Sequence, residues 1–312
     1  MKKLVFLFSL LVVLFTFLIL NLTYQKNPYK LISPILNGQK VLGINQWLPQ
    51  EVLGSQDQAP SISAHAGLFI DTKAGQILYS KNADKKLPIA SLVKVMTVLI
   101  ALEHKKLDDT YVVSQRAASM EPDKMLLIAG EKLTLKELLD GIFLVSANDA
   151  AEVLAEGTLR QAQGEQEGRD EFIKLMNSKA QQLGMKNTFY ANPTGLDEDT
   201  NNSYSSAYDL ALLTRYLIRN YPEVVDISKQ EHVFLPQTET HQDYDMYSGI
   251  NLLTTYPGVV GFKTGYTPEA GLTLITLARK DNHEVIGVLL GSGARRDEAR
   301  ELLDYSFKKL GS

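Results

Sequence analysis

The sequence predicts a mixed α/β fold in which an antiparallel sheet is flanked by helices and is interrupted by an inserted helical lobe. Three observations support this fold class. Strand-like segments occur early and late in the globular region, helical segments fill the interval between them, and 312 residues are enough for a sizeable buried core. The composition, with 45% hydrophobic and 22% charged residues, is that of an ordinary globular protein.

The strand signals lie at the two ends of the globular region. Segments 66–70 and 76–79 flank a turn rich in Asp and Gly, which is typical of a β-hairpin. Strand signals return at 272–277 and 284–290, where apolar and β-branched residues dominate. We therefore expect early and late strands to share one sheet, with the helices between them forming the lobe.

The helical signals are apolar residues at helical spacing. A long run of this kind follows Pro88, from Ser91 to about Glu103, and predicts a helix. The polar, aperiodic stretch from Gln161 to Gly168 predicts a surface loop. Further helices are predicted at about 135–144, 147–158, 170–183, 205–219 and 296–309.

The N-terminus predicts a membrane segment. Met1-Lys2-Lys3 precedes an uncharged stretch, Leu4 to Leu22, which as a helix would span roughly 28 Å, close to the hydrocarbon core of a bilayer. A cleaved secretory signal is the alternative, but its apolar region is usually shorter, and no small-x-small cleavage site follows. We favour an uncleaved signal anchor at 1–22. Either segment would export the rest of the chain to the periplasm or cell envelope.

Two further regions follow the predicted anchor. Residues 23–62 mix prolines and glycines with polar residues, which predicts a linker or a loosely packed arm. Residues 63–312 contain all the strand and helix signals described above and are expected to form the globular domain.

Composition excludes several classes of function. The chain has no cysteine, so disulfides, thiolate zinc sites and a cysteine nucleophile are ruled out. A formal net charge of −4 gives no basic surface typical of nucleic-acid binding. Neither metal-ligand spacing nor a phosphate-binding loop is recognisable, so we expect no metal and no organic cofactor.

Three short motifs point to acyl-transfer chemistry through their order along the chain. A second S-x-x-K begins at Ser306 and a second S-x-N at Ser80, so each pattern alone is weak. Only the first S-x-x-K is followed by S-x-N and then by the single K-T-G, an order found in serine enzymes that act on D-alanyl peptides or β-lactams. The strings are Ser91-Leu-Val-Lys94, Ser146-Ala-Asn148 and Lys263-Thr264-Gly265.

Ser91 and Lys94 are the candidate nucleophile and base. On a helix, side chains three positions apart share one face, with Cβ atoms about 5–6 Å apart. Serine needs a base, and none of the five histidines lies in a recognisable triad string. A lysine base must be neutral, which costs about 4.6 kcal/mol at pH 7, so burial and a second cation, for which Lys263 is the candidate, must lower its pKa. The alternative is a helix N-cap at Ser91 and a solvated Lys94.

The other two motifs supply polar groups around the predicted nucleophile. Ser146 could relay a proton and Asn148 could hold a substrate backbone, although either could simply cap the following helix. Lys263 and Thr264 could bind a terminal carboxylate, and Gly265 would let a substrate backbone approach closely. The amides of Ser91 and Tyr266 are the expected pair of donors to an oxyanion.

From about residue 63 to 310 the chain resembles the D-alanyl-D-alanine carboxypeptidases, the low-molecular-mass penicillin-binding proteins. Many strings besides the three motifs match in sequence order, which makes the resemblance specific. They are Asn82-Ala-Asp84, Pro88-Ile-Ala-Ser-Leu-Val-Lys94, Ser146-Ala-Asn-Asp-Ala150, Leu183-Gly-Met-Lys-Asn-Thr188, Asn192-Pro-Thr-Gly-Leu196, Asn251-Leu-Leu253 and Phe262-Lys-Thr-Gly-Tyr-Thr267.

The resemblance implies a penicillin-binding serine peptidase domain at 63–312, with a fold like that of β-lactamases and transpeptidases. Ser91 would be acylated with Lys94 as base, and Ser146 and Asn148 would assist. Lys263 and Thr264 would orient the substrate carboxylate. An arginine at the start of the last helix would also meet that carboxylate, and Arg295 fits this position, although a surface charge is the alternative.

The chain departs from the family pattern in several places. Val260 stands where relatives commonly have an acidic residue, Ala147 stands where glycine is usual, and the polar stretch at 161–168 looks like an insertion. The chain stops soon after the predicted final helix, without the extra C-terminal β-domain and membrane-binding helix of many relatives. We expect the N-terminal anchor to attach the domain to the cytoplasmic membrane instead.

The implied function is removal of the terminal D-Ala from peptidoglycan stem peptides through a seryl ester, with β-lactams as covalent inhibitors. The motifs do not separate this activity from cleavage of D-alanyl cross-links by an endopeptidase. A β-lactamase is less well supported, because no E-x-x-L-N string lies between the second and third motifs. A wall-binding protein with an inactive site is the remaining alternative. The sequence is silent on the third stem residue and on the oligomeric state.

Overall fold

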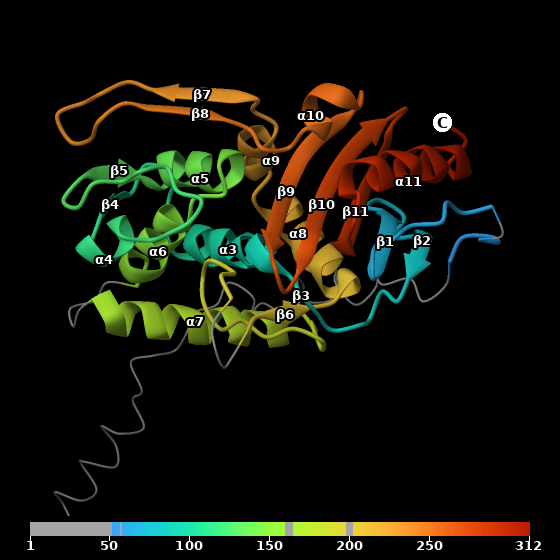
Figure 1. Cartoon of the computed structure of the whole chain (residues 1–312), viewed down its shortest axis with the longest axis horizontal. Helices are drawn as coiled ribbons and strands as arrows, with labels where there is room; N and C mark the ends of the chain where they lie inside the picture. Colours follow the sequence, from blue (N-terminus) through green and yellow to red (C-terminus); the bar gives the residue numbers. More distant parts are fainter. Residues whose placement is uncertain (1–51, 57, 160–164, 198–201) are drawn as a thin grey trace, which may run out of the picture. The chain divides into compact units, whose positions relative to one another are not determined.

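The centre of the structure is a five-stranded antiparallel sheet with strand order β2-β1-β11-β10-β9 (Figure 1). This computed structural model describes residues 52–56, 58–159, 165–197 and 202–312. The order places β9, which carries the K-T-G motif, at one edge of the sheet. The strands are β1 (Ala66–Asp71), β2 (Ile77–Lys81), β9 (Val259–Thr267), β10 (Gly271–Lys280) and β11 (His283–Ser292).

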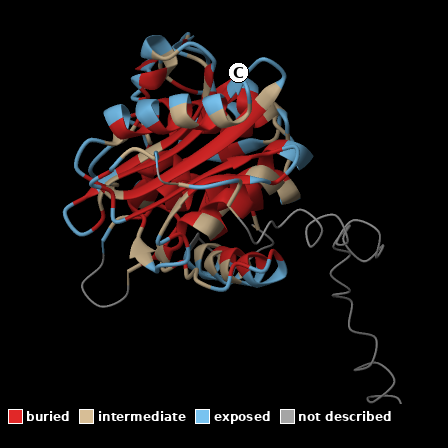
Figure 2. Ribbon diagram, turned by 90° about the vertical axis from the view of Figure 1, so that its right-hand side faces the viewer, coloured by how far each residue is buried: buried red, intermediate tan, exposed pale blue. Residues whose placement is uncertain are grey.

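Helices cover both faces of this sheet. α11 (Arg295–Lys309) packs on one face, where Leu302 and Phe307 join a core that includes Phe69 and Leu289. α8 (Ala207–Asn220) contacts β1 and β11 on the other face. Figure 2 shows the consequence, a sheet whose strands are buried along most of their length. Apolar residues on both faces of each strand are what such a sheet requires.

A helical lobe is inserted between the early and late strands. One of its helices, α5, starts with a capping box in which Thr134 and Glu137 satisfy each other's backbone amides. The elements of the lobe are η2 (Ala90–Val93, a 3₁₀ helix), α3 (Lys94–His104), α4 (Gln115–Ala118), α5 (Leu135–Leu144), α6 (Asn148–Gly157) and α7 (Glu165–Gln182).

Short paired strands and two small helices complete the described fold. The hairpin formed by β7 and β8 lies over α5 in Figure 1, and both of its strands contact that helix. These elements are β3 (Leu87–Pro88) with β6 (Tyr204–Ser205), β4 (Thr110–Val112) with β5 (Lys132–Thr134), β7 (His232–Leu235) with β8 (Tyr244–Tyr247), α9 (Glu223–Ser228) and α10 (Leu252–Thr255).

The fold class predicted from the sequence is confirmed, with two corrections. The first turn of the helix predicted from Ser91 is a 3₁₀ turn, and the α-helix begins at Lys94. The loop predicted at 161–168 is wrong for residues 165–168, which form the first turn of α7. Gly168 lies where this turn packs on α6, since a Cβ on it would lie 2.7 Å from the carbonyl oxygen of Glu156. Its lack of a side chain lets α7 pack closely on α6.

Part of the predicted arm lies against the domain. Val52 forms an isolated bridge with Ile77, the amide of Leu53 donates to the Ile77 carbonyl, and Leu53 packs on the core. The anchor predicted at 1–22 and most of the arm fall outside the described residues. Within the described part, none of the helices has the length and apolar character needed to cross a bilayer.

Candidate functional site

The backbone around Ser91 is held in an unusual conformation by a close contact between two loops. Ala90, immediately before Ser91, has a φ of 48°, a left-handed value that costs energy for a residue with a side chain. Gly195, with a φ of 82°, packs on this peptide so tightly that a Cβ would lie 2.0 Å from the Ala90 carbonyl oxygen. The loop containing Gly195 therefore fixes where η2 begins and where Ser91 points.

Lys94 lies directly beside Ser91 and is fully buried. Its Nζ is 2.8 Å from the Ser91 Oγ and donates to the Thr194 carbonyl oxygen at 2.7 Å. Its exposed fraction is zero, which excludes the solvated position that the sequence left open. Burial, and secondly the positive charge of Lys263, lower the pKa of Lys94 well below its ordinary value. The arrangement favours a neutral amine next to a hydroxyl.

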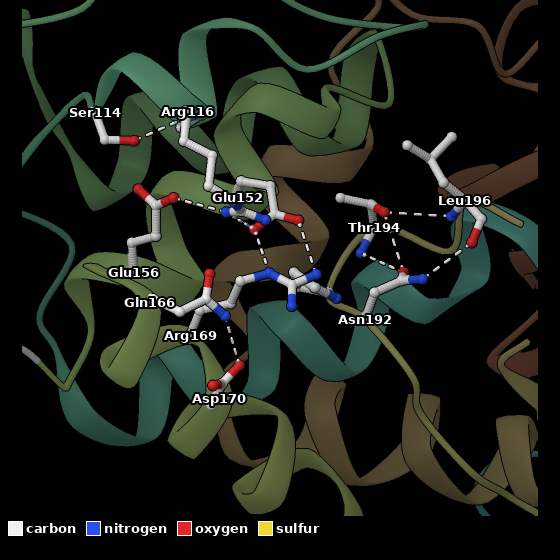
Figure 3. Close-up of polar contacts among 12 residues, drawn as sticks. Ser114, Arg116, Glu152, Glu156, Gln166, Arg169, Asp170, Asn192, Thr194 and Leu196 are labelled. Carbon is white, nitrogen blue, oxygen red and sulfur yellow. Dashed lines mark hydrogen bonds and ion pairs between the residues drawn. The ribbon is translucent and has the colours of Figure 1, made fainter. Parts of the chain in front are cut away.

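The Thr194 carbonyl is positioned by a turn that Asn192 organises (Figure 3). The Asn192 Oδ1 accepts from the Gly195 amide at 2.7 Å and from the Thr194 amide at 3.2 Å, and its Nδ2 donates to the Leu196 carbonyl at 3.0 Å. Such an Asx turn imposes one backbone geometry on the residues that follow it. Asn192 therefore helps to position Lys94, because the turn that it forms holds the Thr194 carbonyl that Lys94 contacts.

Ser146 and Lys263 are in contact, and Lys263 lies within electrostatic reach of Lys94. The Lys263 Nζ donates to the Ser146 Oγ and to the Thr264 carbonyl oxygen, each at 2.8 Å. Lys263 is 1% exposed, and burial together with the neighbouring Arg295 lowers its pKa to about 7. Ser146 has a φ of 62°, again a left-handed value in a residue with a side chain. Strained backbone of this kind, at Ser146 and at Ala90 just before Ser91, is common where geometry serves a function.

Asn148 begins α6 and has an unused acceptor. Its backbone amide donates to the Asp123 carbonyl at 2.8 Å, and its Nδ2 donates to the Pro122 carbonyl. Its Oδ1 is buried and has no hydrogen-bond partner among the described residues. A buried polar atom without a partner costs free energy, so this acceptor is a candidate contact for a bound ligand. The helix-capping alternative fails, since Asn148 lies inside α6 and the cap residue Ala147 makes no side-chain bond.

The K-T-G segment passes directly over the Ser91 amide. A Cβ on Gly265 would lie 2.9 Å from the Ser91 nitrogen and 2.6 Å from the Thr273 Oγ1, so only glycine fits there. The neighbouring side chain of Tyr266 is 61% exposed. Because β9 is an edge strand, its outer side has no neighbouring strand within the sheet.

Arg295 lies at the same corner of the site. Its Nη1 donates to the Gly265 carbonyl at 2.6 Å and to the Thr273 carbonyl at 3.2 Å. It lines a small pocket with Thr264, Asn251 and Arg296. Arg295 therefore contacts the K-T-G segment that passes over the Ser91 amide, and it is not a free surface charge.

Other contacts were not anticipated from the sequence. The Thr194 carbonyl is the main one, because a backbone acceptor one hundred residues from Lys94 leaves no side-chain signature. Another lies on α6, where the buried Glu152 pairs with Arg116 at 2.9 Å and with Arg169 at 3.0 Å (Figure 3). This cluster holds α4 and α7 against the helix that carries Asn148.

Comparison with known proteins identifies the family of this chain. The family of D-alanyl-D-alanine carboxypeptidases, peptidase family S11, matches residues 54–294. The chain belongs to this family. The resemblance drawn from the motifs is therefore confirmed, and so is the serine-peptidase class that it implied.

Curated members of the family match over most of the chain. It is 34% identical to the carboxypeptidase DacF of Bacillus subtilis over 288 residues, which cover 90% of this chain and 71% of that one. It is 30% identical to DacB2 of Mycobacterium tuberculosis over 254 residues, 80% of this chain and 84% of that one.

Solved structures of family members share the fold. The DD-transpeptidase of Streptomyces K15 superposes with a TM-score of 0.74 at 28% identity, covering 80% of this chain and 98% of that one. The carboxypeptidase DacD of Francisella tularensis gives a TM-score of 0.70 at 28% identity, covering 84% of this chain and 74% of that one.

Proposed function

We propose that the protein is a serine-type D-Ala-D-Ala carboxypeptidase that removes the terminal D-Ala from peptidoglycan stem peptides through an ester on Ser91. The single observation that carries this proposal is the 2.8 Å contact between Ser91 Oγ and the fully buried Nζ of Lys94. Membership of the carboxypeptidase family supports the substrate class.

Lys94 is the base in this proposal. A neutral amine has one lone pair and two hydrogens, so Nζ can donate to the Thr194 carbonyl while its lone pair accepts the Ser91 proton. The Ser91 oxygen then attacks the carbonyl carbon of the penultimate D-Ala. The amine of the terminal D-Ala leaves with a proton, and water hydrolyses the ester in a second step that regenerates Ser91.

Ser146 and Lys263 are proposed to act together in protonating the amine of the terminal D-Ala as it leaves. The Ser146 hydroxyl accepts from the Lys263 Nζ at 2.8 Å, which leaves its own hydrogen directed elsewhere. It is proposed to pass its proton to the departing amine and to recover one from the Lys94 ammonium, which took that proton from Ser91. Both side chains are held by the structure around them, so the transfer needs little rearrangement.

The rest of the site is proposed to bind the substrate. The open edge of β9 can pair with an extended peptide, and the free Oδ1 of Asn148 can accept an N–H from it. A terminal carboxylate is proposed to interact with Lys263, Thr264 and Arg295; Thr264 and Arg295 line one pocket, and Arg295 is close enough to Lys263 for its charge to lower the Lys263 pKa. The amides of Ser91 and Tyr266 are the proposed oxyanion donors.

β-Lactams are proposed to acylate Ser91 and to remain bound. Deacylation needs an activated water, and the sequence has no E-x-x-L-N string to hold one. The acidic residue in the nearest similar string, Glu156, is paired with Arg116 at 2.7 Å. Its carboxylate is therefore committed to a structural ion pair.

The substrate class also bears on location. Because peptidoglycan lies outside the cytoplasm, the domain is proposed to act there, attached to the membrane by the segment predicted at residues 1–22. Fractionation of cells that express the full chain, followed by detection of the uncut N-terminus in the membrane fraction, tests this location.

Labelling with a fluorescent penicillin tests the function. Wild-type protein should form a covalent adduct that survives denaturation, and Ser91→Ala should form none, with Ser306→Ala, in the second S-x-x-K string, as a matched control that labels normally. Absence of label on wild type would refute the acyl-enzyme. Digestion of purified muropeptides then separates the two peptidase activities, because release of free D-Ala from uncross-linked peptides indicates a carboxypeptidase and loss of cross-linked dimers indicates an endopeptidase.

A further inference from the structure

A group of cationic side chains surrounds one buried carboxylate at the far end of the sheet. Glu284, on β11, is 7% exposed and uses both of its oxygens in ion pairs. Its Oε1 accepts from Arg219 at 3.2 Å and its Oε2 from Arg279 at 2.9 Å. Arg215 lies next to this pair and donates its Nε to the Thr72 carbonyl at 3.0 Å. Two guanidinium groups therefore pair with one carboxylate, and a third lies next to them.

Arg215 lies close enough to Arg219 for the two positive charges to repel each other. Burial, and secondly the charge of Arg219, lower the pKa of Arg215 to about 10, while the charge of Glu284 acts in the opposite direction. The exposed fractions of the Arg219 and Arg279 side chains are 44% and 51%, so both guanidinium groups reach solvent. An anion bound from solution would relieve this repulsion.

A pocket opens beside the cluster. It has a volume of about 290 Å³ and lies at the turn between β10 and β11, where Asp281 and Asn282 both have positive φ. Lys73 reaches across from the β1–β2 turn and donates to the Asn282 Oδ1 at 2.8 Å, which closes one side. The other cationic side chains that line it are Arg279 and Lys280.

More cationic than anionic side chains lie around this pocket. Asp226 also lies within electrostatic reach of Arg279 but is bound to Lys229 at 2.6 Å. The whole chain carries a formal net charge of −4, so a local excess of cations is not a property of the surface as a whole. The cations are Lys73, Arg215, Arg219, Arg279 and Lys280, and the nearby carboxylates are Asp71, Asp281 and Glu284.

We propose that this pocket is a binding site for a phosphate group. Guanidinium and ammonium donors suit phosphate oxygens in charge and geometry, and few apolar side chains line the pocket to favour a larger ligand. The site is separate from Ser91. Lys280 is five residues along β10 from Ile275, which pairs with Lys263, so the two sites lie roughly 17 Å apart along the strand.

Calorimetric titration of the full chain in an uncharged detergent tests the proposal. The probes are inorganic phosphate, glycerol phosphate and a short-chain phosphatidylglycerol, each at matched ionic strength. Wild type should bind at least one of them saturably. The double variant Lys73→Gln, Lys280→Gln should bind about tenfold more weakly, equivalent to about 1.4 kcal/mol, because it removes two cations and leaves the pairs of Glu284 intact.

The matched control is Lys106→Gln, Lys186→Gln, which removes the same charge at two exposed lysines elsewhere. It should bind phosphate as wild type does. A stronger response to the lipid than to inorganic phosphate would identify a headgroup as the source, and the reverse would identify free phosphate. No saturable binding of any probe, or equal weakening in both double variants, would overturn the proposal. Penicillin labelling should be unchanged in all of these variants, so the outcome is independent of the proposed function.

Discussion

Gly195 lies against the peptide of Ala90, and an ideal Cβ on Gly195 would be 2.0 Å from the Ala90 carbonyl oxygen. That peptide immediately precedes Ser91, so the contact determines where the candidate nucleophile stands. The loop that carries Gly195 also supplies the Thr194 carbonyl to Lys94. One loop therefore sets the position of both members of the pair.

Gly195→Ala should destabilise the protein and abolish penicillin labelling, because the new methyl group collides with backbone. We expect a loss of at least about 3 kcal/mol in the free energy of unfolding. Gly184→Ala is the matched control, since Gly184 has a similar φ of 75° but no atom within 4 Å of the added Cβ. It should lose only about 1 kcal/mol and label normally. Equal effects of the two changes in urea unfolding would contradict this explanation.

Lys94→Arg should slow acylation by about 10²- to 10⁴-fold, the usual contribution of a general base. Arginine stays charged at every accessible pH, so it can donate to Ser91 but cannot accept its proton. Stopped-flow acylation by a chromogenic β-lactam measures the rate, and Lys174→Arg on the exposed face of α7 should have no effect. A near-normal rate in Lys94→Arg would mean that another group is the base.

The rate of acylation should depend on pH in a bell-shaped manner. It should rise as Lys94, whose pKa is depressed, loses its proton, because only the neutral amine is a base. It should fall above about pH 7 as Lys263 deprotonates and its attraction for the carboxylate of the β-lactam is lost. Second-order rate constants measured from pH 5 to 9 give both limbs.

The alkaline limb can be assigned with Lys263→Arg. Its guanidinium keeps its charge, so the fall above about pH 7 should disappear while the acid limb remains. Covalent labelling at pH 7 checks that the variant site is intact. If the alkaline limb stays in place in a variant that still labels, Lys263 is not the group responsible.

Glu152→Gln should lower the free energy of unfolding by about 2–3 kcal/mol, because the buried carboxylate balances the charges of Arg116 and Arg169. Glu171→Gln removes an exposed carboxylate that pairs with Lys174 at 3.3 Å, and it should cost less than about 1 kcal/mol. Urea unfolding of the two variants compares a buried pair with an exposed one. Similar losses would show that the cluster on α6 contributes no special stability.

Much of the fold could be predicted because local signals agree with the tertiary structure. The helix predicted at 135–144 has the observed bounds of α5, since a capping box marks its start and apolar periodicity marks its length. The hairpin formed by β7 and β8 was not predicted. Eight residues separate Leu235 from Tyr244, so the two-residue turn that signals a hairpin in sequence is absent.

The site could be predicted from the sequence only where side chains, and not backbone groups, form it. Ser91, Lys94 and Lys263 belong to motifs with a chemical rationale, and the structure brings them together. Backbone groups have no such signature. The Thr194 carbonyl that meets Lys94 and the left-handed backbone of Ala90 depend on which loops pack together, and this packing follows from the tertiary fold rather than from local sequence.

The outer side of β9, which has no partner within the sheet, also has a pharmacological consequence. A strand-shaped molecule without any electrophile could occupy it through main-chain hydrogen bonds alone. Such a compound would compete with antibiotics for the site yet dissociate freely. Resistance that arises from faster ester hydrolysis would offer the cell no protection against it.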